Sequence, residues 1–428
     1  MRREKADVLV LGGGPAGISA AISAKRRNLG VRVILVSSEP SHYMRPAVTA
    51  LLEDPRVSPE EIVSLDPVFL LGQGVEPFTR GRVTELTDGL AHAQGPWGEV
   101  EFEYESLIIA TGGVPFVPPI EGVDLRGVYS VRTLRDARRL ANLLRPGVRL
   151  SVVGAGLAGV KLAVAASRRG AVVTLLEMKR VLWTVLDPPL TDLAKKLVEG
   201  SGVRVLENKA VDRIVEGPQG SVSGVEAGGE VIKADLVVFA TGVKPNSALA
   251  RSLGLKLGIR GAIKTDEGMS TSKRGVWAAG DCAETLDLIT GKPTYRPIGS
   301  IAFLGGKIAG INAAGGSARY RGFIRRQAED VKGLHLVSLG LTGAEAQALG
   351  LEYDVVELHS SWPDPQLPWW LKRPLKLSVA IVERGTDRLI GFQAIGGPLA
   401  RRKSYTIVRM IAEGREVSSL ETLGFKAA

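Results

Sequence analysis

The chain has 428 residues, of which 45% are hydrophobic and 23% charged, a balance typical of folded globular proteins that excludes disordered and fibrous classes. This length predicts about three domains. The formal net charge of +10 suits anionic ligands but does not bear on the fold. The single cysteine, Cys282, excludes an internal disulfide framework, a Cys-x-x-Cys redox pair and a cysteine-rich zinc site. The four scattered histidines predict no metal centre.

Two segments repeat one supersecondary pattern. The first is an apolar stretch at 7–11, a glycine-rich turn, a small-residue helix to about Arg27 and a second apolar stretch at 31–37. The second has the same order, from 150–153 through a helix to about Arg169 and on to 171–177. Strand, glycine-rich turn, helix and strand form a βαβ unit of a parallel sheet. The repeat therefore predicts an α/β fold with two Rossmann-like nucleotide-binding domains.

Each copy carries the spacing Gly-x-Gly-x-x-Gly, at Gly12, Gly14 and Gly17 and again at Gly154, Gly156 and Gly159. The first glycine allows a tight turn after the strand, and the second lets a pyrophosphate approach the backbone. The third lets the helix pack closely on the strand, with the phosphates at the helix N-terminus. One copy alone is a weak signal. Two copies in strand–turn–helix context predict two bound dinucleotides.

The residue at the end of each second strand discriminates between coenzymes. Glu177 occupies the place where a carboxylate accepts hydrogen bonds from a ribose 2′-hydroxyl and repels a 2′-phosphate. This favours NADH over NADPH, although Lys179 and Arg180 follow closely. In the first copy Ser37 holds this place and Glu39 lies two residues later; either is a candidate, and we prefer Glu39. A solvated strand end is the alternative interpretation of both glutamates.

Three later motifs extend the pattern. Apolar strands run into Ala-Thr-Gly turns at 110–112 and 240–242, where a chain can cross between nucleotide domains. A short strand at 275–279 ends in Gly280-Asp281, whose carboxylate can accept from a polyol such as a flavin ribityl chain. A small-residue helix is predicted over 297–310, and its N-terminus suits the electron-rich edge of a flavin ring.

Taken in order, these motifs resemble the FAD-dependent pyridine nucleotide–disulfide oxidoreductase superfamily over nearly the whole chain. The resemblance implies a FAD-binding domain in two parts, 1–118 and 245–320, and an inserted NAD(H)-binding domain at 119–244. It also implies a C-terminal α+β interface domain at 321–428 that pairs two subunits as a homodimer. In its last domain we expect a strand at 375–382, a hairpin at 385–388 and a strand at 389–395.

The resemblance also assigns ligand contacts residue by residue. The residues that it implies for FAD are Gly12, Gly13, Gly14, Pro15, Ala16, Gly17, Ser38, Glu39, Arg45, Pro46, Val83, Ala110, Thr111, Gly112, Gly280, Asp281, Ile298, Gly299 and Ser300. Those that it implies for NAD(H) are Gly154, Gly156, Leu157, Ala158, Gly159, Glu177 and Gly242. NADP(H) is the less favoured coenzyme.

The branch of the family is indicated by Tyr43-Met-Arg-Pro46, which is similar to the Tyr-x-Arg-Pro pattern of ferredoxin-reductase-like flavoproteins. Relatives that use a cysteine place it near Arg45, where this chain has none. Catalysis by a thiolate needs a thiol, so disulfide or peroxide reduction by that route is excluded. We expect Cys282 to be buried and inert, and we place the chain in a cysteine-less NADH oxidase and ferredoxin-reductase-like branch.

One departure concerns charge beside the flavin. Ferredoxin-reductase-like relatives have a lysine and a glutamate where this chain has Ala50 and Lys161. Our hypothesis is that Lys161 supplies positive charge near flavin N5, where negative charge develops as hydride arrives. The alternative is that Lys161 lies on a solvated helix face. With Arg45, it is a candidate catalytic residue.

The segment Trp362–Arg373 gathers three tryptophans and two cations. It is either a subunit or partner interface, which we favour, or a contact with a membrane surface. No segment is predicted to span a membrane, and we expect a cytoplasmic protein.

We predict a FAD-dependent NAD(P)H oxidase or dehydrogenase that passes electrons to oxygen, a quinone or a small electron carrier. Two alternatives stay open: the FAD subunit of an amine or imino-acid dehydrogenase complex, and a redox-sensing flavoprotein that binds a partner. Nucleic-acid binding is not predicted, because there is no contiguous basic run with interleaved aromatic residues.

Overall fold

The structure, a computed structural model, describes residues 2–54, 56–331, 334–360 and 375–427. The chain folds into two compact units. Unit 1 consists of Met1–Ala47, Pro59–Val114 and Val243–Phe323, and unit 2 of Val48–Ser58, Pro115–Gly242 and Ile324–Ala428. Each unit is thus assembled from three separate stretches of sequence. The four domain segments implied by the resemblance stay a prediction.

Unit 1 is built on a seven-stranded sheet in the order β5-β2-β1-β8-β7-β6, with β19 paired to β8. Strands β5, β2, β1, β8 and β19 run parallel, whereas β6, β7 and β8 form an antiparallel meander. Its strands are β1 (Arg2–Leu11), β2 (Val33–Val36), β5 (Val75–Phe78), β6 (Arg82–Thr87), β7 (Leu90–Gly95), β8 (Gly98–Ile109) and β19 (Val276–Ala278). Its main helices are α1 (Pro15–Arg27) and α9 (Gly299–Ala313).

The remaining elements of this part of the chain are short. They are β3 (His42–Tyr43), the 3-10 turn Arg45–Thr49, α3 (Pro59–Ile62), β4 (Val63–Leu65), α4 (Pro67–Gly72), β9 (Gly113–Pro115), β18 (Val243–Pro245), α8 (Ala248–Ser252), the 3-10 turn Ile259–Gly261, β20 (Thr285–Leu286) and β21 (Pro293–Thr294).

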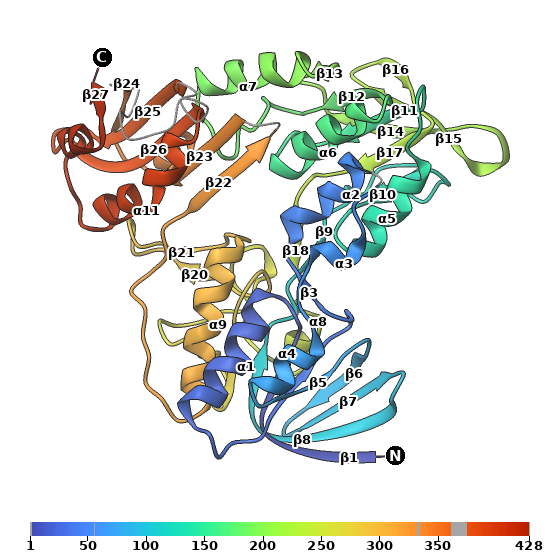
Figure 1. The fold of residues 1–428 in the computed structure, drawn as a ribbon, viewed down its shortest axis with the longest axis vertical. Coiled ribbons are helices and arrows are strands. Elements are labelled where there is room, and N and C mark those ends of the chain that lie inside the picture. The colour runs from blue at the N-terminus through green and yellow to red at the C-terminus, as the bar shows by residue number, and fades with distance from the viewer. Residues whose placement is uncertain (1, 55, 332–333, 361–374, 428) are drawn as a thin grey trace. The chain divides into compact units, whose positions relative to one another are not determined.

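Helices α1 and α9 lie side by side in unit 1 (Figure 1). Two glycines allow this approach: a Cβ on Gly306 or on Gly310 would lie 2.1 Å from the backbone oxygen of Ala16 or of Ala20, respectively. The helices run parallel, because residue numbers rise together along the contact. Gly306 lies seven residues after the start of α9, and Ala16 lies one residue after the start of α1. The first six residues of α9 therefore extend about 9 Å beyond the start of α1.

Unit 2 contains a five-stranded parallel sheet in the order β10-β17-β11-β12-β13. Between β13 and β17 the chain forms a separate antiparallel sheet in the order β14-β15-β16. The strands are β10 (Val128–Ser130), β11 (Arg149–Val153), β12 (Val172–Leu176), β13 (Val203–Leu206), β14 (Val211–Glu216), β15 (Val222–Ala227), β16 (Glu230–Lys233) and β17 (Leu236–Phe239). The helices are α2 (Ala50–Glu53), α5 (Leu134–Leu143), α6 (Leu157–Arg168) and α7 (Leu190–Glu199), with a 3-10 turn at Pro218–Gly220.

The last part of unit 2 is a six-stranded sheet in the order β22-β23-β26-β25-β24-β27. Its elements are β22 (Arg326–Val331), β23 (Leu334–Gly340), α10 (Gly343–Ala348), β24 (Tyr353–Ser360), β25 (Leu375–Glu383), β26 (Arg388–Gly396), α11 (Leu399–Ala412), the 3-10 helix Val417–Leu423 and β27 (Phe425–Ala427). The two strands and the hairpin predicted here are confirmed by β25 and β26.

The parallel strands of both sheets, with their helices, confirm the predicted α/β class with Rossmann-like sheets. The tryptophan segment Trp362–Arg373 lies outside the described residues, so its interface or membrane role stays a prediction. Within the part of the chain that the structure describes, no helix is both long enough and apolar enough to cross a membrane.

Candidate functional site

The first glycine-rich turn leads from β1 into α1. Gly12 has a φ of +123°, and a Cβ there would lie 2.1 Å from the backbone oxygen of Ala110. A Cβ on Gly17 would lie 1.8 Å from the backbone oxygen of Gly12. Neither place can hold a larger residue without moving backbone. Gly14, which caps α1, is different: a Cβ on it would meet no protein atom within 4 Å, so the outer side of the turn is open.

The second glycine-rich turn, from β11 into α6, has the same construction. Gly154 has a φ of +100°, with the backbone oxygen of Ala240 only 2.8 Å from an added Cβ. A Cβ on Gly159 would lie 1.9 Å from the backbone oxygen of Gly154. Gly156 caps α6 and faces open space. Both fingerprints therefore adopt the turns that their glycine spacing predicts.

These turns fit dinucleotides. Each helix begins at its open glycine, has no acidic residue in its first turn, and presents free backbone N–H groups there. Such N-termini bind phosphates, because the N–H groups and the helix dipole both favour negative charge. Leu157, Ala158 and Pro15, which were implied as contacts, all lie in these first turns. The cradles suit one pyrophosphate in unit 1 and another in unit 2.

Two parallel strands bring further predicted FAD residues to the first turn. Strand β8 ends before Ala110-Thr-Gly112 and its neighbour β19 ends before Gly280-Asp281. Gly280 has a φ of +84°, and its Cβ position is 2.9 Å from the Cβ of Ala16. The Thr111 hydroxyl donates to the backbone oxygen of Asn246 at 2.6 Å. The carboxyl ends of parallel strands are where ligands bind in such sheets.

The start of α9 also belongs to this end of unit 1. Ile298 caps the helix, and Gly299 and Ser300 are exposed in its first turn. No protein atom lies within 4 Å of a Cβ position at Gly299. Because α9 extends past α1, this N-terminus projects beyond the first glycine-rich turn. It is therefore available to a ligand longer than the pyrophosphate.

A charged cluster follows β2. The Tyr43 hydroxyl donates to Glu39 at 2.7 Å, and Arg45 donates to Glu39 at 3.0 Å and to the Tyr43 oxygen at 2.9 Å. The carboxylate preferred for a ribose thus already has two protein partners. Ser37, the other candidate, is buried, and its Oγ is 2.4 Å from a Cβ position at Gly13, directly behind the turn. The structure places Ser37 at the turn and leaves the choice between the two candidates open.

His42 is a contact that the sequence did not reveal. Its Nδ1–H donates to the backbone oxygen of Gly13 at 3.2 Å, which fixes the ring against the first turn. Burial lowers the pKa of His42 below the usual value of about 6.5, and the nearby Arg45 cation lowers it further. The imidazole is thus held neutral beside the first cradle.

Three other predicted FAD residues, Ser38, Pro46 and Val83, differ in exposure. Ser38 is exposed after β2, and Pro46 lies in the 3-10 turn Arg45–Thr49. Val83, on β6, is half-buried and packs against the core that contains Phe102. Their contacts with FAD stay predictions.

Glu177 lies directly beyond β12 and is only 6% exposed. Its carboxylate accepts from the backbone N–H of Ala155 at 2.8 Å and from that of Lys179 at 2.9 Å. These bonds fix the carboxylate against the second glycine-rich turn, so Glu177 is not a solvated strand end. Each oxygen keeps a second acceptor direction for a ribose hydroxyl.

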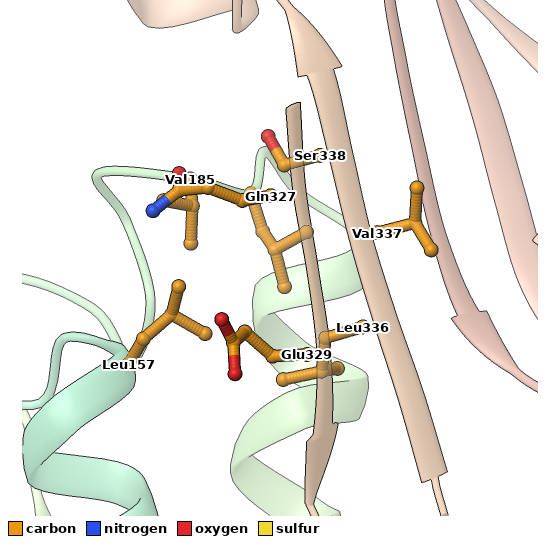
Figure 2. Close-up of a pocket in the computed structure, with 8 residues that line it drawn as sticks. Leu157, Val185, Gln327, Glu329, Leu336, Val337 and Ser338 are labelled. Atoms are coloured by element: carbon orange, nitrogen blue, oxygen red, sulfur yellow. The ribbon is translucent and has the colours of Figure 1, made fainter. Parts of the chain in front are cut away.

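Lys161 forms an ion pair with Glu329 of β22, with Nζ 2.9 Å from the carboxylate oxygen. The side chains are 15% and 25% exposed, so Lys161 does not lie on a solvated face. Glu329 also lines a shallow hollow at the start of α6 that has room for about one water molecule, shown in Figure 2. The hollow is lined by Leu157, Val185, Leu186, Gln327, Glu329, Leu336, Val337 and Ser338.

Glu329 lies 168 residues from Lys161, and neither residue belongs to a motif that links them. The packing of the C-terminal sheet within unit 2 brings the carboxylate to α6, which is why sequence reasoning missed this pair.

Cys282 is fully buried. Its thiol donates to the backbone oxygens of Ile109 and Ala279, each at 3.3 Å, and burial raises its pKa. A buried thiol that stays protonated is neither a nucleophile nor a redox partner.

Comparison with known proteins agrees with this geometry. Residues 6–295 match the family model described as pyridine nucleotide-disulphide oxidoreductase. The chain is 32% identical to the NADH oxidase of Methanocaldococcus jannaschii, covering 79% of this chain and 77% of the relative. It is 32% identical to the CoA-dependent NAD(P)H sulfur oxidoreductase of Pyrococcus furiosus, covering 93% and 90%.

Solved structures give the same result. The NAD-dependent persulfide reductase from A. fulgidus is 30% identical with a TM-score of 0.88, and the match covers 99% of this chain and 80% of that one. The water-forming NADH oxidase from Lactobacillus brevis, bound to NADH, shares the fold at 22% identity and a TM-score of 0.88, covering 98% and 92%. The chain therefore belongs to the pyridine nucleotide-disulphide oxidoreductase family, a family of oxidoreductase enzymes whose cofactors are FAD and NAD(H).

Proposed function

We propose that this protein is a FAD-dependent NADH oxidoreductase that passes electrons to its acceptor without a protein thiol. The observation that carries the proposal is the single, fully buried Cys282, in a chain whose two glycine-rich turns both fit a dinucleotide. A redox cysteine must reach the flavin or the acceptor, and a thiol enclosed in the core of unit 1 reaches neither.

FAD supplies the redox chemistry when bound, taking hydride from NADH and passing the electrons on. The turn Gly12–Gly17 holds its pyrophosphate, and Asp281 accepts from the ribityl hydroxyls. The projecting N-terminus of α9 places positive dipole at the polar edge of the ring. Arg45, bonded to Glu39 and Tyr43, orients the chain that follows β2.

NADH binds to unit 2. The turn Gly154–Gly159 holds its pyrophosphate, and Glu177 accepts from the adenosine ribose. Lys161 is the candidate catalytic residue here: its ammonium group, held by Glu329, favours the negative charge that develops during hydride transfer.

The acceptor is proposed as oxygen, a quinone or a small electron carrier. The sulfur-reducing relative is named for its dependence on CoA, and this name makes a sulfur acceptor the rival to test. The sulfur rival without a chain thiol would require direct attack by the reduced flavin.

The test is an anaerobic reduction of the purified holoprotein by NADH, followed by separate reoxidation with oxygen, a quinone, ferredoxin and CoA persulfide. We expect rapid reduction by NADH and fastest reoxidation by one of the first three. Fastest reoxidation by CoA persulfide would contradict the proposed acceptor class, and no reduction by NADH would contradict the proposed function.

A further inference from the structure

Two cations follow Glu177 at the coenzyme-binding end of β12. Lys179 and Arg180 lie two and three residues beyond the carboxylate that the proposed function places at the adenosine ribose. A cation close to the 2′ position of that ribose is what accommodates a 2′-phosphate. On sequence alone, these residues argue for NADPH, whereas Glu177 argues for NADH. Their side-chain contacts resolve the conflict.

Arg180 is held by the first turn of α7, where its guanidinium forms an ion pair with Asp192. Lys179 is held by Trp183: its Nζ lies 3.9 Å from the centre of the indole ring. Such a cation–π contact is favourable even at an exposed site. Each cation thus already has a protein partner.

We propose that Asp192 and Trp183 are specificity-determining residues that restrain Arg180 and Lys179, so that the preference for NADH rests on this restraint as well as on Glu177. The inference deepens the proposed function and rests on it. In this arrangement Glu177 repels a 2′-phosphate and the two cations that would offset the repulsion are engaged elsewhere. Asp192 acts through Arg180 and is a positioning residue.

The decisive variant is Asp192→Asn, which removes the anionic partner of Arg180 and keeps the size of the side chain. Both partners are substantially exposed, at 39% and 51%, and exposed ion pairs are weak. We therefore expect the ratio of kcat/KM for NADPH to that for NADH to rise about two- to five-fold. The ratio is measured by stopped-flow reduction of the bound flavin. Trp183→Leu acts in the same direction through Lys179.

Three further variants separate restraint from a general charge effect. Asp192→Glu keeps the ion pair and is expected to keep the ratio of the wild type. Glu230→Gln makes the same charge change at a comparably exposed pair in unit 2, that of Arg204 with Glu230, and is expected to leave the ratio unchanged. Adding Arg180→Ala to Asp192→Asn should cancel the gain, because the gain passes through the guanidinium.

Binding of 2′,5′-ADP and of 5′-AMP to the holoprotein, followed by calorimetry, provides a readout that does not need electron transfer. Asp192→Asn should tighten 2′,5′-ADP and not 5′-AMP. The inference is overturned if the Asp192→Asn ratio equals that of Glu230→Gln, or if the gain persists without Arg180. Failure of NADH to reduce the flavin in the wild type would instead overturn the proposed function, whatever the calorimetric results for 2′,5′-ADP and 5′-AMP.

Discussion

The two glycine-rich turns are nearly the same in backbone and differ in the polar groups behind them. In each, the first glycine has a positive φ. A Cβ added to the third glycine would lie only 1.8 or 1.9 Å from the backbone oxygen of the first. Behind the first turn lie Ser37 and the neutral imidazole of His42. Behind the second lies the carboxylate of Glu177. In the proposed function, the backbone sets where a pyrophosphate binds, and the group behind the turn sets which nucleotide is accepted.

The helices that follow differ in the same way. Two residues after the third glycine, α1 has the buried Ser19 and α6 has Lys161 in its ion pair with Glu329. The repeated scaffold therefore carries an ion pair in unit 2 and a neutral side chain at the equivalent place in unit 1.

The largest effect is expected from breaking the turns one at a time. Gly17→Ala forces a Cβ against the backbone of Gly12, and Gly159→Ala does the same at Gly154. Overpacking against backbone costs about 1–3 kcal/mol or more. We expect Gly17→Ala to lose bound FAD and its yellow colour. Gly159→Ala should keep FAD and lose reduction by NADH. Absorbance of the purified proteins and a reduction assay check both, and loss of FAD from Gly159→Ala would contradict the assignment of the turns.

Removing the carboxylate after the second strand of each repeat is expected to give the next largest effect. Glu177→Ala removes a buried acceptor of two backbone N–H groups and a ribose partner. A hydrogen bond to a charged group contributes about 1.5–3 kcal/mol, so Kd for NADH should rise about 10- to 100-fold. Glu39→Ala, the matched change after β2, should leave this Kd unchanged. Titration of holoprotein with NADH under argon measures both; equal effects would mean that Glu177 has no special role.

Replacing Lys161 tests whether the charged side chain on α6 contributes to flavin reduction. Lys161→Ala should slow flavin reduction by NADH about tenfold without loss of FAD, since a preorganised charge acts on the transition state. Lys195→Ala is the matched control, because Lys195 also pairs with a carboxylate in unit 2, that of Glu207 at 3.3 Å. Stopped-flow rates at saturating NADH decide the question. A wild-type rate in Lys161→Ala would remove Lys161 from the mechanism.

The smallest effect is a pH dependence confined to the first turn. Because the pKa of His42 is lowered in the fold, the unfolded chain binds its proton more readily than the folded chain does. This contribution to stability is complete above the unfolded pKa, about 6.5, and is lost as pH falls toward the lowered folded pKa. The loss amounts to at most about 1.4 kcal/mol per pH unit. Release of FAD on heating between pH 7.5 and 5 measures it, and His42→Gln should flatten the profile. An unchanged slope in that variant would contradict the role of His42.

The sequence was sufficient for the repeated part of the molecule. The glycine spacing requires backbone conformations that few other residues adopt, so it predicted both turns, the helices after them and the flanking parallel strands. The burial of Cys282 was expected from the family resemblance, in which the position after Gly280-Asp281 has no redox role. The placement of Glu177 followed for the same reason, since the end of the second strand is fixed by the repeat.

Contacts between distant segments could not be predicted in this way. The pair Lys161–Glu329 depends on how the C-terminal sheet packs within unit 2, and the contact of His42 with Gly13 depends on the path of the loop after β2. Neither contact produces a periodic pattern of residues in the sequence. The hydrogen bonds of Glu39 with Arg45 and Tyr43 also depend on the path of the loop after β2, and the sequence did not reveal them.

The central claim is that no sulfur takes part between NADH and the acceptor, and an anaerobic titration of the holoprotein with NADH tests it most directly. A flavin without a redox-active thiol accepts one hydride, so about one NADH per FAD should bleach the flavin completely and no more should be consumed. Consumption of a second equivalent, with or without loss of a titratable thiol, would contradict the account.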